Sequence, residues 1–342
     1  MRCGYYPGCS LENTCAPYDL STRAVAPVLG LQLEEIEDWN CCGATEVIAL
    51  NKNMAYAMVA RNLALAERQL TTQADAMNGP PTLVAPCSAC FLNLSKTDHY
   101  MAKHPEVEAH TNQALAAGGL HYTPGSLHVR HMVDVVANDV GLEAVKAKVK
   151  RPLRGLRVAP YYGCLIVRPN LPGHTFDDPE YPIHMDRLLT ALGAEVVDFP
   201  LKAHCCGGHM TQISADTAYK LIYQLLRNAA DYNADVIATI CPMCQLNLDA
   251  YQSQVNKHFK TDYELPVLYF TQLMGVAFDL PPRELGLGRE VVSAAKALAK
   301  VGVEVPAEEA TATKPARRKK DDRTLPMPAA RAPAVRKPRM KK

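Results

Sequence analysis

Ten of the twelve cysteines in this chain fall into two sets of five that repeat the same order. Each set consists of a single cysteine, an adjacent pair followed by glycine, and a Cys-x-x-Cys element. Thiolate sulfur is a preferred ligand of zinc and of iron-sulfur clusters, so the pattern predicts two metal centres. The first set is Cys9, Cys41, Cys42, Cys87 and Cys90, and the second is Cys164, Cys205, Cys206, Cys241 and Cys244.

The number of thiols in each set favours an iron-sulfur cluster over zinc. Zinc takes four ligands in a tetrahedron, whereas each set offers five, and two adjacent side chains rarely converge on one small ion. A cluster of several irons accepts an adjacent pair, and the fifth thiol points to an unusual cluster or to a reactive thiol beside one. A scaffold stabilised by zinc remains the structural alternative for the two sets. We interpret Cys3 and Cys15 as buried thiols that pack as small hydrophobic side chains.

The residues around the cysteines show that the chain carries an internal duplication. The segment Tyr5-Tyr6-Pro7-Gly8-Cys9 is echoed by Tyr161-Tyr162-Gly163-Cys164. Both Cys-x-x-Cys elements continue similarly, as Phe91-Leu92-Asn93-Leu94 and Gln245-Leu246-Asn247-Leu248. We therefore expect two pseudo-symmetric domains, at 1–150 and 151–306.

Each repeat alternates short apolar runs with segments of helical periodicity. Strands are predicted at 82–85, 158–162, 195–199 and 235–240. Helices are predicted after Gly208, over 245–252 and over 133–150, and a loop is predicted over 169–182. Such alternation is typical of an α/β fold with Rossmann-like halves, in which parallel strands place cysteine ligands at their carboxyl ends.

Composition narrows the class of protein further. No apolar run is long enough to span a membrane, and the first residues lack the apolar region of a secretory signal, so we expect a cytoplasmic chain with reduced thiols. Residues 307–342 contain 12 basic and 4 acidic residues without apolar periodicity, which predicts a disordered basic tail. No aromatic residues are interleaved with its charges, so we expect no nucleic-acid binding.

The duplicated pattern Cys-x(n)-Cys-Cys-Gly-x(n)-Cys-x-x-Cys resembles the cysteine-rich CCG domain of the heterodisulfide reductase B-subunit family, over about residues 1–280. The resemblance implies that each set holds a non-cubane [4Fe-4S] cluster, giving two [4Fe-4S] clusters. It also implies that Cys42 and Cys206, each followed by glycine, lie nearest the substrate cleft. The glycine would donate its N–H to a cluster sulfur.

The resemblance further implies the activity and the partners. Members of this family cleave a disulfide of small thiols, with one sulfur going to each cluster. They receive electrons from a small ferredoxin-like iron-sulfur partner, often with a flavoprotein behind it. The chain itself has no ferredoxin-type cysteine run and no dinucleotide fingerprint, so electrons must come from another subunit. Membrane contact is expected only through such partners.

Three basic residues flank the second cysteine pair and could donate a proton to a leaving thiolate. They are Lys202, His204 and His209, and the alternative for each is a hydrogen-bonded loop residue. Our candidate catalytic residues are Cys42, Cys206 and His204. We therefore expect the catalytic iron-sulfur subunit of a disulfide-reducing or disulfide-forming enzyme. The alternative is an electron-transfer or anchoring subunit of a succinate- or lactate-type dehydrogenase.

Overall fold

The chain forms two four-stranded sheets in which every strand pair is parallel, which confirms the predicted α/β fold with two matching halves. The computed structural model describes residues 1–71, 79–171 and 176–306. The predicted basic tail, 307–342, lies outside the described residues. The strand order is β2-β1-β3-β4 in the first sheet and β6-β5-β7-β8 in the second, so the duplication extends to the topology.

The first sheet is built from four short strands and is followed by a helical linker. The strands are β1 (Arg2–Tyr5), β2 (Gln32–Glu35), β3 (Thr82–Ala85) and β4 (His128–His131). The helices of this half are α1 (Ala16–Val28), α2 (Glu46–Leu50), α3 (Lys52–Thr71), α4 (Ser88–Lys103) and α5 (Pro105–Ala116). The linker contains α6 (Met132–Asp134), the π-helix η1 (Val135–Gly141) and α7 (Leu142–Ala147).

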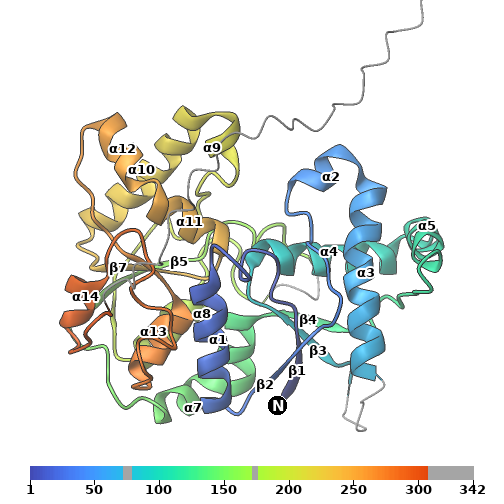
Figure 1. Ribbon diagram of the computed structural model, residues 1–342, viewed down its shortest axis with the longest axis horizontal. Coiled ribbons are helices and arrows are strands. Elements are labelled where there is room, and N and C mark those ends of the chain that lie inside the picture. Colours follow the sequence, from blue (N-terminus) through green and yellow to red (C-terminus); the bar gives the residue numbers. More distant parts are fainter. Residues whose placement is uncertain (72–78, 172–175, 307–342) are drawn as a thin grey trace, which may run out of the picture. The chain divides into compact units, whose positions relative to one another are not determined.

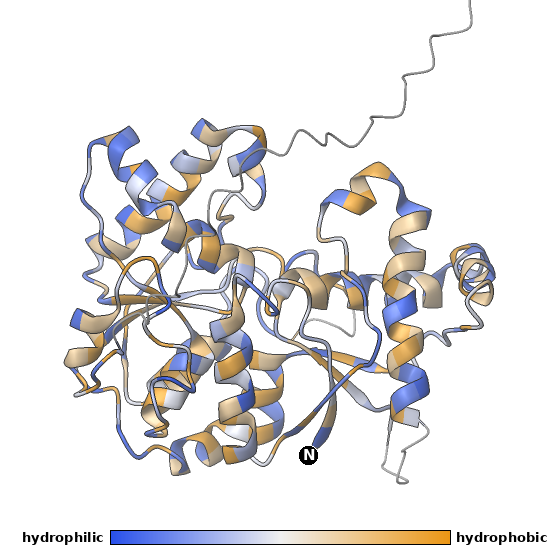
Figure 2. Ribbon diagram, viewed as in Figure 1, coloured by the Kyte–Doolittle hydropathy of each residue, from blue (hydrophilic) through white to orange (hydrophobic). Residues whose placement is uncertain are grey.

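The second half repeats this plan. Its strands are β5 (Arg157–Tyr161), β6 (Glu195–Val196), β7 (Val236–Thr239) and β8 (Val267–Tyr269). Its helices are α8 (His184–Ala191), α9 (Met210–Ile213), α10 (Ala215–Asp231), α11 (Pro242–Ala250), α12 (Gln252–Phe259), α13 (Phe270–Ala277) and α14 (Ala295–Ala299). The central strands β3 and β7 are coloured as hydrophobic in Figure 2, because helices cover both faces of a parallel sheet.

Most predicted elements are present, with shifted ends. The strand at 82–85 agrees with β3, while the one predicted over 195–199 is only two residues long. The helix predicted over 245–252 begins at Pro242, because proline suits the first turn of a helix. The described residues within 169–182 contain no helix or strand, in agreement with a loop.

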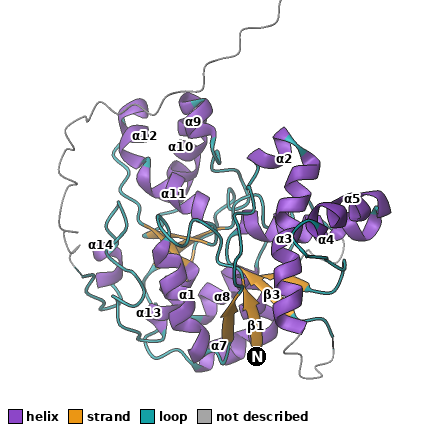
Figure 3. Ribbon diagram, turned by 45° about the vertical axis from the view of Figure 1, so that its right-hand side comes forward, coloured by secondary structure: helices purple, strands orange, loops and turns teal. Residues whose placement is uncertain are grey.

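The two halves share one interior, across the predicted boundary at residue 150. Helix α1 contacts β2 of its own half and α13 of the other half (Figures 1 and 3). The ring of Tyr18 stacks on that of Tyr269 with centroids 4.1 Å apart, and the Ser21 and Thr271 hydroxyls are 2.6 Å apart. The division into two domains at residue 150 stays a prediction, and the described residues form one compact unit.

Candidate metal centre

The sheet register brings the cysteines of each repeat to one edge. Strands β1 and β3 pair through Tyr5 and Val84, and β5 and β7 pair through Tyr161 and Thr239. The carboxyl ends of the paired strands therefore lie side by side, and the cysteines follow these ends in the chain. The single cysteines come after β1 and β5, the adjacent pairs after β2 and β6, and the Cys-x-x-Cys elements after β3 and β7.

Within the first set the thiols lie in close pairs. The Sγ atoms of Cys9 and Cys41 are 3.4 Å apart, and those of Cys42 and Cys90 are also 3.4 Å apart. Cys9 and Cys41 are exposed, whereas Cys42 and Cys90 are buried. The members of the adjacent pair thus point in different directions, one towards solvent and one towards the interior.

The second set repeats these partnerships. The thiols of Cys164 and Cys205 interact by hydrogen bonding, as do those of Cys206 and Cys244. Cys205 is exposed and Cys206 is buried. The equivalence of the two repeats therefore holds for individual thiol contacts as well as for the strand order.

The two sets adjoin one another through Cys87 and Cys241, whose thiols form a hydrogen bond between the halves. The Tyr18 hydroxyl lies 3.0 Å from the carbonyl of Pro86 and 3.2 Å from that of Ile240, the residues that precede these cysteines. One tyrosine thus bonds to both strand ends, and it fixes the place where the two sites meet.

The electrostatics differ between the thiols of each set. Hydrogen bonds with Cys42 and Cys9 lower the pKa of Cys41 to about 2, and the hydrogen bond with Cys164 lowers the pKa of Cys205 to about 6. The neighbouring Cys9 and Cys164 have raised pKa values because they donate these bonds. Each set therefore contains an exposed thiol that is stabilised as thiolate, the form that binds metal.

Glycine permits the turn that follows each cysteine pair. Gly43 and Gly207 have φ values of 76° and 94°, a region that residues with a side chain rarely adopt. Their N–H groups donate to Cys41 Sγ at 3.4 Å and to Cys205 Sγ at 3.3 Å. The resemblance implies that these N–H groups donate to a cluster sulfur. Here each N–H donates to the thiol of the first cysteine of the pair, because the turn folds back on the residue two positions earlier.

An asparagine on the following helix holds each of these turns. The Asn93 amide donates to the carbonyls of Cys42 (3.2 Å) and Ala44 (2.7 Å). In the second half Asn247 donates to the carbonyls of Cys206 (3.2 Å) and Gly208 (2.8 Å). Both asparagines are visible in the sequence three residues after the last cysteine of each set, and their recurrence is the signal that could have indicated this positioning role.

A second glycine in each repeat leaves room for a thiol. A Cβ added to Gly8 (φ +76°) would lie 2.8 Å from Cys90 Sγ, and one added to Gly163 (φ +69°) would lie 2.8 Å from Cys244 Sγ. Real Cβ atoms essentially never come closer than 3.0 Å to another heavy atom. Glycine is therefore required before Cys9 and Cys164 by both backbone conformation and space.

The neighbouring tyrosines show which residues correspond between the two repeats. The Tyr6 hydroxyl donates to the Asn40 carbonyl at 2.7 Å, and the Tyr161 hydroxyl donates to the His204 carbonyl at 2.8 Å. Tyr6 is thus the counterpart of Tyr161, while Tyr162 takes the place of Pro7. Both hydroxyls support the chain immediately before a cysteine pair.

A cavity of about 280 Å³ opens over the second set. All five thiols of that set line it, together with the apolar residues Leu165, Met210, Ile213 and Met243. The first half contributes Glu46, Ser88 and Ala89 to the same cavity. The cavity is therefore shared between the repeats, and a ligand in it would reach the second set of thiols.

The three predicted proton donors lie in different surroundings. Lys202 is buried, with its Nζ 2.9 Å from Asp186 Oδ1 and 3.7 Å from the centre of the Tyr181 ring. His204 is exposed and is not among the residues that line the cavity. The structure therefore does not place His204 beside Cys206 in this cavity. His209 lines the cavity and pairs with Glu46 of the first half, a contact that nothing in the sequence pattern indicates.

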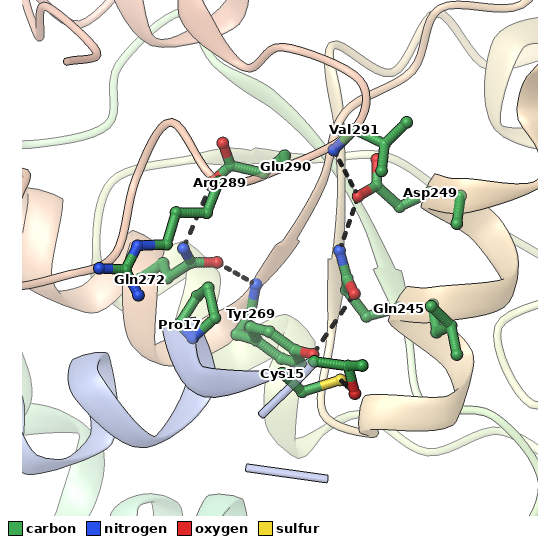
Figure 4. A pocket seen from close by; sticks show the side chains of 12 residues that line it. Cys15, Pro17, Gln245, Asp249, Tyr269, Gln272, Arg289, Glu290 and Val291 are labelled. Atoms are coloured by element: carbon green, nitrogen blue, oxygen red, sulfur yellow. Dashed lines mark hydrogen bonds between the residues drawn. The ribbon is translucent and has the colours of Figure 1, made fainter. Parts of the chain in front are cut away.

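The two unmatched cysteines are buried and do not belong to the close thiol pairs. Cys3 is buried in β1, and burial raises its pKa to about 11. Cys15 is also buried, with its thiol 3.7 Å from the Pro242 carbonyl, and it lines a cavity of about 70 Å³ beside Tyr269 and Gln245 (Figure 4). These positions agree with the packing role predicted for both.

The residues present fit an iron-sulfur cluster in each set. The donors are five thiols from three strand ends, and Cys87 and Cys241 stand at the N-termini of α4 and α11, where free N–H groups favour an anion. The buried Ser88 hydroxyl has no hydrogen-bond partner among the described residues. In that same part of the chain, no three His, Cys, Asp or Glu side chains converge as ligands of a single ion.

The helices that the structure describes are short or polar by the standard of a bilayer. Within residues 1–71, 79–171 and 176–306, none is both long and apolar enough to cross a membrane.

Known proteins resemble this chain over most of its length. Residues 3–95 and 158–249 match the family described as the cysteine-rich domain CCG. The chain is 36% identical over 292 residues to the 8-methylmenaquinol:fumarate reductase membrane anchor subunit of Wolinella succinogenes, covering 85% of this chain and 97% of that protein. It is 30% identical over 297 residues to the B-subunit of the ferredoxin:CoB-CoM heterodisulfide reductase of Methanosarcina mazei, covering 86% and 95%.

A solved structure supports the fold. A hypothetical protein from Helicobacter pylori superimposes with a TM-score of 0.65 at 13% identity, covering 85% of this chain. The chain spans about half of that structure, 52%. With the twofold match to the CCG domain and the relatives that cover nearly the whole sequence, the chain belongs to the heterodisulfide reductase B-subunit family.

Proposed function

We propose that this chain is the catalytic subunit of a heterodisulfide reductase-like complex that reduces or forms a disulfide of small thiols. The observation that carries the proposal is the meeting of two five-thiol sets at Cys87 and Cys241, beside a cavity lined by both halves. A disulfide has two sulfurs and accepts two electrons, so two redox centres that adjoin one binding site suit its chemistry.

Each set would hold one non-cubane [4Fe-4S] cluster. Cys206 would be the buried ligand that lines the substrate cavity, and Cys42 would be its buried counterpart in the first set, outside that cavity. A bound cluster supplies one electron at a time. The chain's own residues position the thiols: Asn93 and Asn247 hold the turns of the cysteine pairs, and Tyr6 and Tyr161 support the residues before them. The apolar side chains of the cavity would contact the carbon chain of a small thiol substrate.

Partner subunits would deliver the electrons. A ferredoxin-like iron-sulfur subunit and a flavoprotein are the expected donors, and the exposed thiols Cys9 and Cys41 offer them an edge of the first centre. Any membrane contact would come through these partners, and the complex would work in the cytoplasm.

A second candidate is an electron-transfer or anchoring subunit of a dicarboxylate dehydrogenase. The similarity to the fumarate reductase anchor subunit of Wolinella succinogenes, at 36% identity, favours it specifically. In that role the clusters would pass electrons without cleaving a disulfide.

The experiment that separates these candidates is turnover by the complex purified without oxygen. With reduced methyl viologen as electron donor, we expect reduction of bis(2-hydroxyethyl) disulfide, measured as thiol released per viologen oxidised, at one disulfide per two electrons. Turnover of fumarate with a quinol, without any disulfide reduction, would instead establish the second candidate.

A further inference from the structure

Among the described residues that line the cavity over the second thiol set there is one imidazole, and it is held by the opposite repeat. His209, at the start of α9, directs Nδ1 to Oε1 of Glu46, at the start of α2. The Glu46 carboxylate also accepts hydrogen bonds from the Thr45 N–H (3.1 Å) and the Thr45 hydroxyl (3.0 Å). The carboxylate therefore fixes the ring and leaves Nε2 as the nitrogen available to a ligand.

The charge of this pair is suited to holding a proton. Partial burial acts to raise the pKa of Glu46, but the hydrogen bonds with His209 and Thr45 together with the charge of His209 outweigh it and hold that pKa below its usual range. The carboxylate is thus ionised where it meets the imidazole, and it can accept the N–H of Nδ1. The His209 side chain is 28% exposed, so it can exchange protons with solvent.

Other groups that face the cavity are poorly placed to donate a proton. The Tyr162 hydroxyl is engaged with Asp186 and accepts the N–H of Met185, and burial raises its pKa far above the ordinary value. The described residues that line the cavity include no lysine or arginine. The five thiols of the second set are committed as ligands under the proposed function, which leaves His209 and its partner Glu46.

The two repeats differ at this position. Counting from the second cysteine of each pair, His209 of the second half corresponds to Thr45 of the first. The imidazole is therefore present once, on the side where the cavity opens. The asymmetry indicates that one of the two product sulfurs is protonated inside the protein.

We infer that His209 is a catalytic proton donor for the thiolate formed in this cavity and that Glu46 is its positioning residue. This rests on the proposed disulfide chemistry. The substrate S–S bond accepts two electrons from the reduced iron-sulfur partner and breaks into two thiolates. One thiolate takes the proton from His209 Nε2, the other is protonated by water after release, and His209 regains its proton from solvent.

The test compares two disulfides that differ in their need for a proton. An alkyl thiolate, from bis(2-hydroxyethyl) disulfide, is a basic leaving group, whereas 5,5′-dithiobis(2-nitrobenzoate) releases an aryl thiolate that stays ionised at neutral pH and needs no acid. With reduced methyl viologen and the complete complex, His209→Gln should lower kcat for the alkyl disulfide by about 100-fold and leave the aryl disulfide within about 3-fold of wild type. Iron content and the electron paramagnetic resonance spectrum should not change.

The pH profile gives a second readout. In the wild type, alkyl disulfide turnover should fall as pH rises and the imidazolium is lost, and this limb should be absent in His209→Gln. Glu46→Gln should lower kcat for the alkyl disulfide and spare the other disulfide, because the imidazole loses the carboxylate that orients its ring. The matched control is His204→Gln, which alters an exposed histidine outside the cavity and should leave both substrates and the profile unchanged.

Four results would count against the role of His209 or its basis. An equal loss with both disulfides, or no loss with either, would overturn the role of His209. A loss in His204→Gln that is confined to the alkyl disulfide would show that the proton comes from His204 instead. If the wild-type complex reduces neither disulfide, the proposed function itself fails, and the inference with it.

Discussion

Replacing Cys42 or Cys206 with serine is expected to lower disulfide turnover by more than about 100-fold, because these thiols are the buried members of their pairs. Cys42 Sγ lies 3.4 Å from Cys90 Sγ, and Cys206 interacts with Cys244 in the same way. A serine hydroxyl does not ionise as a thiol does, so it is a poor ligand for iron. The spectrum of the cluster in the altered repeat should change, and that of the other cluster should persist.

The controls for this prediction are the two cysteines outside the sets. Cys3→Ser and Cys15→Ser should retain iron content and turnover close to wild type, since both thiols are buried and neither belongs to a close pair of thiols. Loss of iron in Cys3→Ser, with metal and activity intact in Cys42→Ser, would show that the ligand assignment is wrong.

The second large effect is expected from a single methyl group. Gly163→Ala would place Cβ 2.8 Å from Cys244 Sγ, and the thiol would have to move from its position in the second set. We expect loss of about half of the iron, corresponding to one of two clusters, with loss of disulfide turnover. Gly8→Ala should act on the first set in the same way, through Cys90.

Matched glycines separate this effect from backbone strain. Gly155 (φ +79°) and Gly30 (φ +72°) have the same left-handed backbone, but no heavy atom lies within 4 Å of an added Cβ. Gly155→Ala and Gly30→Ala should each cost about 1–2 kcal/mol of stability, as the Gly163 and Gly8 variants also do, yet retain full iron content. Equal iron loss in all four variants would mean that strain, and not contact with a thiol, is responsible.

Much of the site could be predicted because it is local in sequence and repeated. The strand at 82–85 and the cysteines after each strand follow from apolar periodicity and from the matching of the two repeats. The same matching pairs Tyr6 with Tyr161, since each lies three residues before the first cysteine of its set, and the hydroxyl contacts of these two tyrosines agree with it.

Contacts between the repeats could not be predicted. The pairing of Glu46 with His209, the hydrogen bond between Cys87 and Cys241, and the bonds from Tyr18 to both strand ends depend on how the two halves pack. No periodicity or spacing within either repeat encodes that packing. For the same reason His204 and His209 could not be ranked from sequence, since both lie in the loop that carries Cys205 and Cys206.

The most direct test of the central claim is the metal and sulfide content of the chain purified without oxygen. One four-iron cluster in each five-thiol set predicts about eight iron atoms and eight acid-labile sulfides per chain, with a brown chromophore that bleaches on reduction. About two zinc ions per chain without sulfide would contradict the account, because the two sets would then be structural zinc sites.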